Sequence, residues 1–214
     1  HDWRLTRGLP PAITGQTGMD ALTHAVEAYI GRSTTRHTRR MATQAVRLVH
    51  DNLLDAYRNG GDERARTAMM EAAYKAGVAF TQSYVGYVHA IAHSLGGQYG
   101  TPHGLANAVI LPHVLRAYGD AAAPRLAELA RAAGVCAQTE PDALAAEAFI
   151  AWVECMNKAL GIPCHLRCIR EEDIPLMAAR ADAEANPLYP VPALWDKDQL
   201  ERMYHVFAGP ASEP

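Results

Sequence analysis

Residues 88–104 carry the pattern around which the rest of the chain can be interpreted; they read Val-His-Ala-Ile-Ala-His-Ser-Leu-Gly-Gly-Gln-Tyr-Gly-Thr-Pro-His-Gly. His89 and His93 are four positions apart, so on a helix they share a face with Cβ atoms about 5–6 Å from each other. The glycines and the proline predict a helix stop at Gly96-Gly97, a tight connection and a new helix that starts near His103. A helical imidazole that faces a second imidazole at the start of the next helix indicates a metal site.

A second pair of candidate ligands lies earlier in the chain, where Asp20 and His24 are again four positions apart. With His89 and His103 they offer one carboxylate and three imidazoles, a set that suits Fe²⁺, Zn²⁺, Co²⁺ or Ni²⁺ and not Mg²⁺ or Ca²⁺. Three neutral imidazoles and one carboxylate leave a divalent ion with one net positive charge. The predicted use is therefore a Lewis acid that polarises a substrate oxygen, which requires an open coordination position.

The composition indicates a globular chain with no electrostatic preference for nucleic acid or an anionic membrane. The 214 residues predict one domain, or at most two small ones, and 49% of them are hydrophobic, enough for a sizeable core. The net charge of −3 excludes an electrostatic footprint for nucleic acid or an anionic membrane, and no apolar run approaches the roughly 20 residues of a membrane span. Because the chain begins at His1 without a Met, we expect a segment of a longer polypeptide. The cysteines predict reduced thiols of a cytoplasmic protein, with a thiol metal site as the alternative; they are Cys136, Cys155, Cys164 and Cys168.

Helical periodicity recurs along most of the chain, and no stretch alternates convincingly as a strand would. The first sixteen residues are expected to be a loop, with Thr17 as the N-cap of the first helix. Pro112 is expected to kink or restart its helix. The fold prediction for residues 1–214 is a single all-α domain of about eight or nine helices. Besides the helix that carries His89, they are expected at about 17–30, 38–57, 63–83, 103–118, 122–133, 141–160, 171–185 and 197–207.

Other classes of metal site fit this sequence less well. A metalloprotease H-E-x-x-H motif is absent, because Ala90 follows His89 where the Glu base would stand. The chain has no E-x-x-H pair, which disfavours a carboxylate-bridged di-iron bundle. An HD-type phosphohydrolase that uses His24, His50 and Asp51 stays open as an alternative, although it leaves residues 88–104 without a role. Taken singly, any of the histidines could be structural.

Two long motifs together resemble the C-terminal helical domain of the iron-containing (group III) alcohol dehydrogenases. Residues 18–29, Gly-Met-Asp-Ala-Leu-Thr-His-Ala-Val-Glu-Ala-Tyr, are similar to that family's first metal segment. Residues 89–97, followed by Pro-His-Gly-Leu-Ala-Asn-Ala at 102–108 and by Leu111-Pro112, are similar to its second. With Leu9-Pro10-Pro11 and Asn186-Pro187, the resemblance spans nearly all of the chain.

The resemblance implies Asp20, His24, His89 and His103 as metal ligands, with Fe²⁺ favoured and Zn²⁺ as the alternative ion. It implies that His93 is the nearby histidine that helps to move the alcohol proton outward. The retained ligands argue against the metal-free maleylacetate reductase branch.

The activity implied is hydride transfer between an alcohol and the nicotinamide of NAD or NADP, which yields an aldehyde or ketone. The family binds the dinucleotide in an N-terminal α/β domain that has no counterpart in this sequence. We therefore expect that domain as a partner, a homo-oligomer, and little or no activity from these residues alone. A non-catalytic helical module that keeps the metal site is the alternative.

Overall fold

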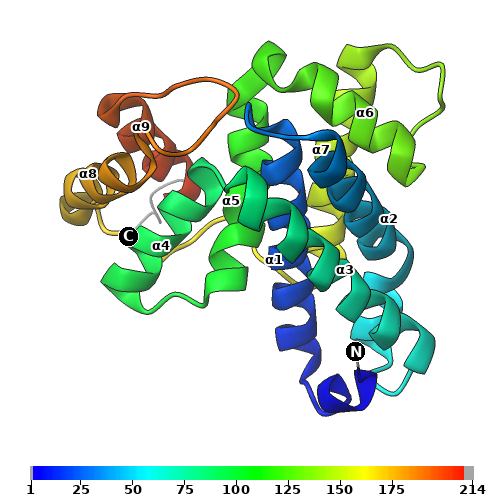
Figure 1. Cartoon of the computed structure of the whole chain (residues 1–214). Helices are drawn as coiled ribbons and strands as arrows, with labels where there is room; N and C mark the ends of the chain where they lie inside the picture. Colours follow the sequence, from blue (N-terminus) through cyan, green and yellow to red (C-terminus); the bar gives the residue numbers. More distant parts are fainter. Residues whose placement is uncertain (1, 210–214) are drawn as a thin grey trace.

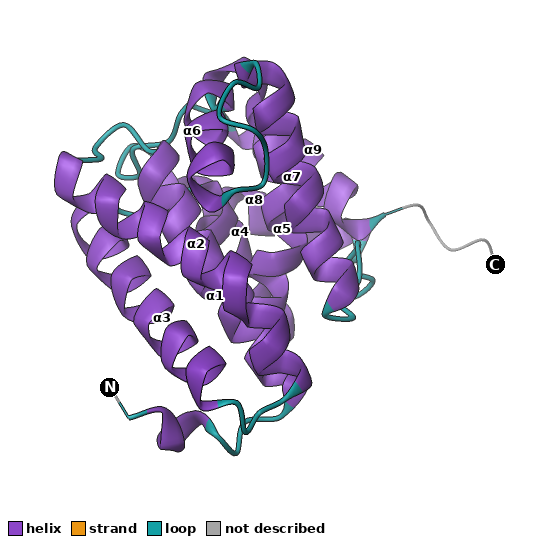
Figure 2. Ribbon diagram, turned by 90° about the vertical axis from the view of Figure 1, so that its right-hand side faces the viewer, coloured by secondary structure: helices purple, strands orange, loops and turns teal. Residues whose placement is uncertain are grey.

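The structure is a computed structural model that describes residues 2–209, and these residues form nine α-helices and no strand (Figures 1 and 2). This confirms the predicted all-α class. His1 and residues 210–214 of the predicted 1–214 domain lie outside the described residues. The α-helices are α1 (Pro11–Ile30), α2 (Arg36–Arg58), α3 (Glu63–Ser83), α4 (Tyr87–Tyr99), α5 (His103–Tyr118), α6 (Ala123–Ala133), α7 (Asp142–Ala159), α8 (Ile174–Ala185) and α9 (Lys197–Ala208).

Helix α1 is the central element. Pro11 is its first residue, where the fixed φ suits a helix and the missing N–H costs no hydrogen bond. From Met19 to Ile30 nearly every side chain of α1 is buried, as expected for a helix surrounded by others. It packs against α2, α3 and α5, while α8 and α9 lie on the other side of the molecule against α4 and α5 (Figure 1).

Local sequence explains where α2 and α3 begin. Thr35 and Thr38 form a reciprocal capping box, in which each side-chain oxygen accepts the other residue's backbone N–H at 2.8 and 3.1 Å. The Asp62 side chain caps α3 by accepting the N–H of Ala65 at 2.9 Å. The predicted start of the helix at 63 is confirmed, and so is its end at Ser83.

Three local predictions were wrong. The first sixteen residues are not a loop, because α1 already begins at Pro11 and Thr17 lies inside it, where its hydroxyl donates to the carbonyl of Ile13 at 2.8 Å. Helix α4 also runs through Gly96-Gly97 and ends at Gly100, whose φ of +65° is the left-handed conformation that glycine adopts at low cost.

Helix α5 continues through Pro112, so the predicted restart of the helix does not occur there. A proline inside a helix leaves the carbonyl four residues earlier without its N–H partner, here the carbonyl of Ala108. The amide Nδ2 of Asn157, on α7, donates to that oxygen at 2.6 Å. The lost hydrogen bond is thus replaced from a neighbouring helix, and α5 continues from His103 to Tyr118.

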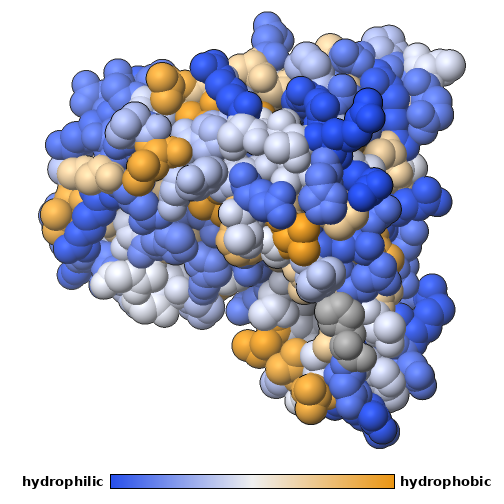
Figure 3. Space-filling model, viewed as in Figure 1, coloured by the Kyte–Doolittle hydropathy of each residue, from blue (hydrophilic) through white to orange (hydrophobic). Residues whose placement is uncertain are grey.

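The interior is a single cluster of apolar side chains that extends across all nine helices. On the face shown in Figure 3, hydrophobic residues lie in small separate groups among hydrophilic ones. None of the helices within residues 2–209 combines the length and the apolarity that crossing a membrane requires. Helices α1, α4 and α5 meet beside this core, and the candidate ligands lie where they meet.

Candidate metal centre

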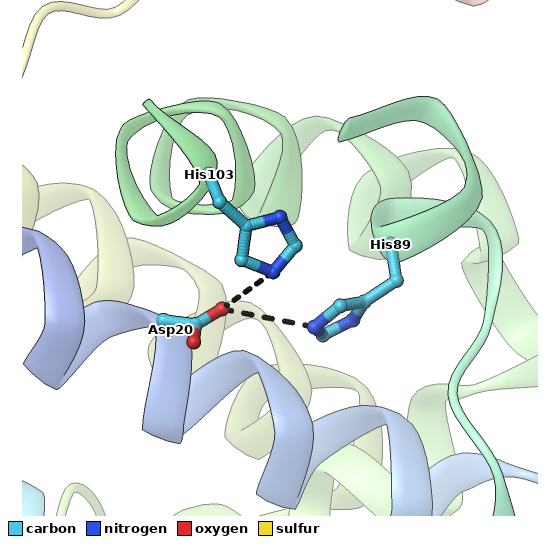
Figure 4. A group of neighbouring side chains, drawn as sticks. All are labelled: Asp20, His89 and His103. Carbon is cyan, nitrogen blue, oxygen red and sulfur yellow. Dashed lines mark ion pairs between the residues drawn. The ribbon is translucent and has the colours of Figure 1, made fainter. Parts of the chain in front are cut away.

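Asp20, His89 and His103 converge from three helices on one point (Figure 4). The Oδ1 atom of Asp20, on α1, lies 3.2 Å from Nε2 of His103, the first residue of α5. The same oxygen lies 3.7 Å from Nε2 of His89, in the first turn of α4. The ligand atoms of the three residues all lie within 4.8 Å of one another. Segments far apart in the sequence therefore present one carboxylate oxygen and two ring nitrogens to a shared space.

The spacing of these atoms fits a small divalent ion. Ligands about 2.1 Å from a tetrahedral ion are about 3.4 Å apart, close to both distances measured from Asp20. The side-chain nitrogen Nδ2 of Asn107 lies 2.6 Å from Oδ1 of Asp20, 3.0 Å from Nε2 of His103 and 3.2 Å from Nε2 of His89. Three candidate ligand atoms thus surround one amide nitrogen, while Oδ1 of Asn107 is buried without a hydrogen-bond partner among residues 2–209. Such a donor set is the kind that a cation would bind.

A buried carboxylate contacts the ring nitrogen of His89 that does not face Asp20. Its Nδ1 lies 2.6 Å from Oε2 of Glu27, and both side chains are 2% exposed. Burial disfavours the charged imidazole, but the hydrogen bonds with Asp20 and Glu27 outweigh it and raise the pKa of His89 to about 9. Burial likewise favours a neutral Asp20, yet its hydrogen bonds with His103 and His89 hold the pKa of Asp20 far below the ordinary value. The ring of His89 thus lies between two carboxylates, a setting that favours positive charge.

His24 lies beside this group, one helical turn after Asp20. Its Nδ1 is 3.0 Å from the carbonyl oxygen of Asp20, an arrangement that leaves Nε2 for a ligand. Its ring lies between Phe80 and His89, with centroids 4.2 Å from each. Burial and the charge of His89 lower the pKa of His24 to about 4, so it is a neutral imidazole. Of the four residues that the sequence predicts as ligands, the structure groups three closely and places the fourth next to them.

His93 lies outside the group. Its side chain is 45% exposed and its Nδ1 is 2.7 Å from Oε1 of Glu184, on α8. The hydroxyl of Tyr189 donates to the same oxygen at 2.8 Å. Burial opposes the ionised carboxylate, but these hydrogen bonds lower the pKa of Glu184. The ring of His93 stacks on that of His103 at 5.2 Å, so a solvent-accessible imidazole borders the candidate site.

Sequence reasoning missed the residues that hold the histidines. Glu27 and Asn107 lie within the motifs but were assigned no role, and Glu184 lies outside them. Glu27 follows His24 by three positions, so a shared helix face could have indicated it. Nothing in the sequence places Glu184 next to His93, because that contact depends on how α8 packs on α4.

Within residues 2–209, the alternative HD-type site is not assembled. His50 and Asp51 hydrogen-bond to each other at 2.8 Å on α2, and the ring of His50 contacts Trp152. Among the described residues, the cluster with metal-ligand geometry is the one formed by Asp20, His89 and His103. His50 and Asp51 are not part of it.

The fold and the donor set define a helical domain built around a mixed carboxylate and histidine centre. A family model described as "Fe-containing alcohol dehydrogenase family, C-terminal" matches residues 14–207. The chain therefore belongs to this family, as its motifs predict.

Individual relatives agree with this assignment. The 1,3-propanediol dehydrogenase of Klebsiella pneumoniae is 44% identical over 188 residues, which cover 87% of this chain and 49% of the relative. A crystal structure of 1,3-propanediol oxidoreductase superimposes with a TM-score of 0.90 at 41% identity, over 95% of this chain and 53% of that one. Sulfoacetaldehyde reductase from Bifidobacterium kashiwanohense, solved in complex with NAD⁺, gives a TM-score of 0.83 at 31% identity, over 97% of this chain and 53% of that one. The chain thus spans about half the length of the relatives that it matches.

Proposed function

We propose that this chain is the metal-binding half of an NAD(P)-dependent alcohol dehydrogenase that interconverts alcohols with aldehydes or ketones. The observation that carries the proposal is the convergence of Asp20 Oδ1, His89 Nε2 and His103 Nε2 in a chain of this family. Asp20, His24, His89 and His103 would hold the ion, with Fe²⁺ favoured and Zn²⁺ as the alternative. When bound, the ion would act as a Lewis acid toward the alcohol oxygen.

His93 is the residue that we propose moves the proton. Glu184 accepts a hydrogen bond from Nδ1, which leaves Nε2 of His93 free to take the hydroxyl proton of an alcohol. Because the side chain is 45% exposed, the proton can pass from the ring to water. Tyr189 and His93 both donate to Glu184, and together they keep the imidazole in one orientation beside His103.

The other substrate of the reaction is the nicotinamide cofactor, which supplies the redox chemistry while the protein places it. Residues 2–209 contain no strand and hence no βαβ unit for a dinucleotide. The relatives are about twice as long as the match, and one was solved with NAD⁺. We propose that an N-terminal α/β domain binds NAD or NADP and closes the site over a small alcohol or aldehyde. A cytoplasmic homo-oligomer is the expected setting.

The test is a fusion of this chain to the N-terminal half of the Klebsiella relative, loaded with Fe²⁺ or Zn²⁺ without oxygen. We expect alcohol-dependent formation of NADH or NADPH by the fusion, and none by the same fusion carrying His89→Ala. A folded fusion that binds metal and dinucleotide but never turns over would favour a non-catalytic helical module. Sustained turnover by residues 1–214 alone would contradict the assignment of dinucleotide binding to another domain.

A further inference from the structure

We propose that Glu27 is a positioning residue of the metal centre, which holds the hydrogen of His89 on Nδ1 and thereby presents Nε2 to the ion. This inference rests on the metal site proposed above and adds a residue that does not itself touch the ion. It concerns how tightly and in what geometry the site binds metal.

The hydrogen-bond geometry fixes which ring nitrogen carries the hydrogen. An ionised carboxylate can only accept hydrogen bonds. Oε2 of Glu27 lies 2.6 Å from Nδ1 of His89, so the hydrogen between them belongs to His89. Nε2 of the neutral ring then has its lone pair on the opposite side, toward Asp20. A carboxylate behind a ligand histidine orients the ring and raises its basicity.

The other oxygen of Glu27 anchors the same contact to the backbone. Oε1 accepts the N–H of Val88 at 2.8 Å. This N–H is in the first turn of α4, where helical groups lack an internal partner and the N-cap residue Gly86 supplies no side chain. Glu27 thus joins α1 to the start of α4 at two successive residues. The carboxylate that contacts the imidazole of His89 is therefore itself fixed by the backbone of α4.

The packing around Glu27 leaves room for this arrangement and for little else. A Cβ atom on Gly86 would lie 2.8 Å from Oε1 of Glu27 and 3.5 Å from the side chain of Val191. Glu27 is 3% exposed and His89 is 2% exposed, so water does not compete for the hydrogen bond. An alanine at position 86 would force the carboxylate to shift while leaving its charge in place.

Glutamine at position 27 tests the proposal most sharply. Its amide offers one oxygen and one NH₂ group where the carboxylate accepts two N–H groups. If the oxygen keeps Val88, the NH₂ faces His89 and favours the tautomer with hydrogen on Nε2, which cannot bind an ion. If the oxygen keeps His89, the N–H of Val88 loses its acceptor. Either arrangement weakens the contacts that residue 27 makes with α4 and with the ligand His89, while the volume of the side chain stays nearly the same.

Glu184 and His93 provide a matched control within the same chain. Glu184 also accepts a hydrogen bond from a histidine Nδ1, at 2.7 Å, but that histidine is not a proposed ligand. Glu184→Gln makes the same chemical change as Glu27→Gln, but at the partner of His93, which lies one helical turn after His89 on α4. It should leave metal affinity as in the wild type.

The experiment measures the Zn²⁺ dissociation constant of the whole chain by competition with a chromophoric chelator. We expect Glu27→Gln to bind Zn²⁺ about 10–100-fold more weakly than the wild type. In the Zn²⁺-loaded wild type, NMR should show a slowly exchanging, strongly downfield Nδ1 proton on His89, and Glu27→Gln should lose that signal. A purely structural role for Glu27 would not move it.

The outcomes separate this inference from the proposed function. A wild-type chain that binds no metal contradicts the site itself. A wild type that binds Zn²⁺, with Glu27→Gln equally tight and the Nδ1 signal unchanged, overturns only the role of Glu27. Should Glu27→Gln fail to fold by circular dichroism, Gly86→Ala decides: weaker Zn²⁺ binding supports the proposal, and unchanged affinity overturns it.

Discussion

Among the histidines that the structure describes, His24 and His50 each have Nδ1 close to an oxygen of their own helix. Nδ1 of His24 is 3.0 Å from a backbone carbonyl, and the ring is buried against that of His89. Nδ1 of His50 pairs with the adjacent Asp51 at the protein surface. The ring of His24 therefore lies beside the candidate ligands, and the ring of His50 lies away from them.

Substitution of these two histidines separates the metal-site hypotheses. His24→Ala removes a proposed ligand, so we expect Zn²⁺ affinity to fall by roughly tenfold or more. His50→Ala should leave that affinity unchanged, whereas an HD-type phosphohydrolase would lose metal binding. Isothermal titration of both variants, with circular dichroism as the folding control, checks the prediction. Wild-type affinity in His24→Ala would reduce the ligand set to Asp20, His89 and His103.

At the scale of helices, the close approach of α1 and α5 sets the distance between Asp20 and His103. Gly104, which follows His103, has no room for a side chain, because an added Cβ would collide with the backbone carbonyl of Gln16 on α1 and lie 2.7 Å from its carbon. A backbone group cannot rotate away as a side chain can. This glycine is therefore required by packing at the base of the metal centre.

Gly104→Ala should push α5 away from α1. We expect a loss of about 1–3 kcal/mol in the free energy of unfolding, typical of overpacking, together with weaker Zn²⁺ binding. Gly97→Ala is the matched control, because an added Cβ in α4 meets nothing within 4 Å. That variant should be as stable as the wild type or up to about 1 kcal/mol more stable. Urea unfolding of the metal-free proteins measures both, and equal stability of the two variants would contradict the packing argument.

Helices were predictable where their own residues cap them, as Asp62 does for α3 and Gly134 for α6. The predictions failed where a distant residue decides the outcome. Pro112 is tolerated because Asn157 supplies the missing donor to Ala108, and periodicity along α5 contains no sign of that contact. Gly96-Gly97 looked like a stop because glycine is a poor helix former, yet α4 continues through both glycines and ends at the C-cap Gly100.

At the scale of the whole molecule, spacing within each motif indicated the candidate ligands, and the fold brings Asp20, His89 and His103 together from separate helices. Their supporting partners could not be predicted in this way. Glu27 holds His89 across the contact between α1 and α4, and Glu184 holds His93 across that between α4 and α8. Such pairs depend on tertiary packing, which a single sequence does not display.

Metal content tests the central claim most directly. The chain is purified without oxygen, and bound iron and zinc are measured by mass spectrometry alongside His89→Ala. We predict about one Fe or Zn ion per wild-type chain, because the four proposed ligands would share one ion, and an empty His89→Ala variant that still folds. A folded wild-type chain that stays empty after anaerobic incubation with Fe²⁺ or Zn²⁺ would contradict the assignment of a metal centre. A His89→Ala variant that retains its ion would contradict it as well, because the assigned ligands are Asp20, His24, His89 and His103.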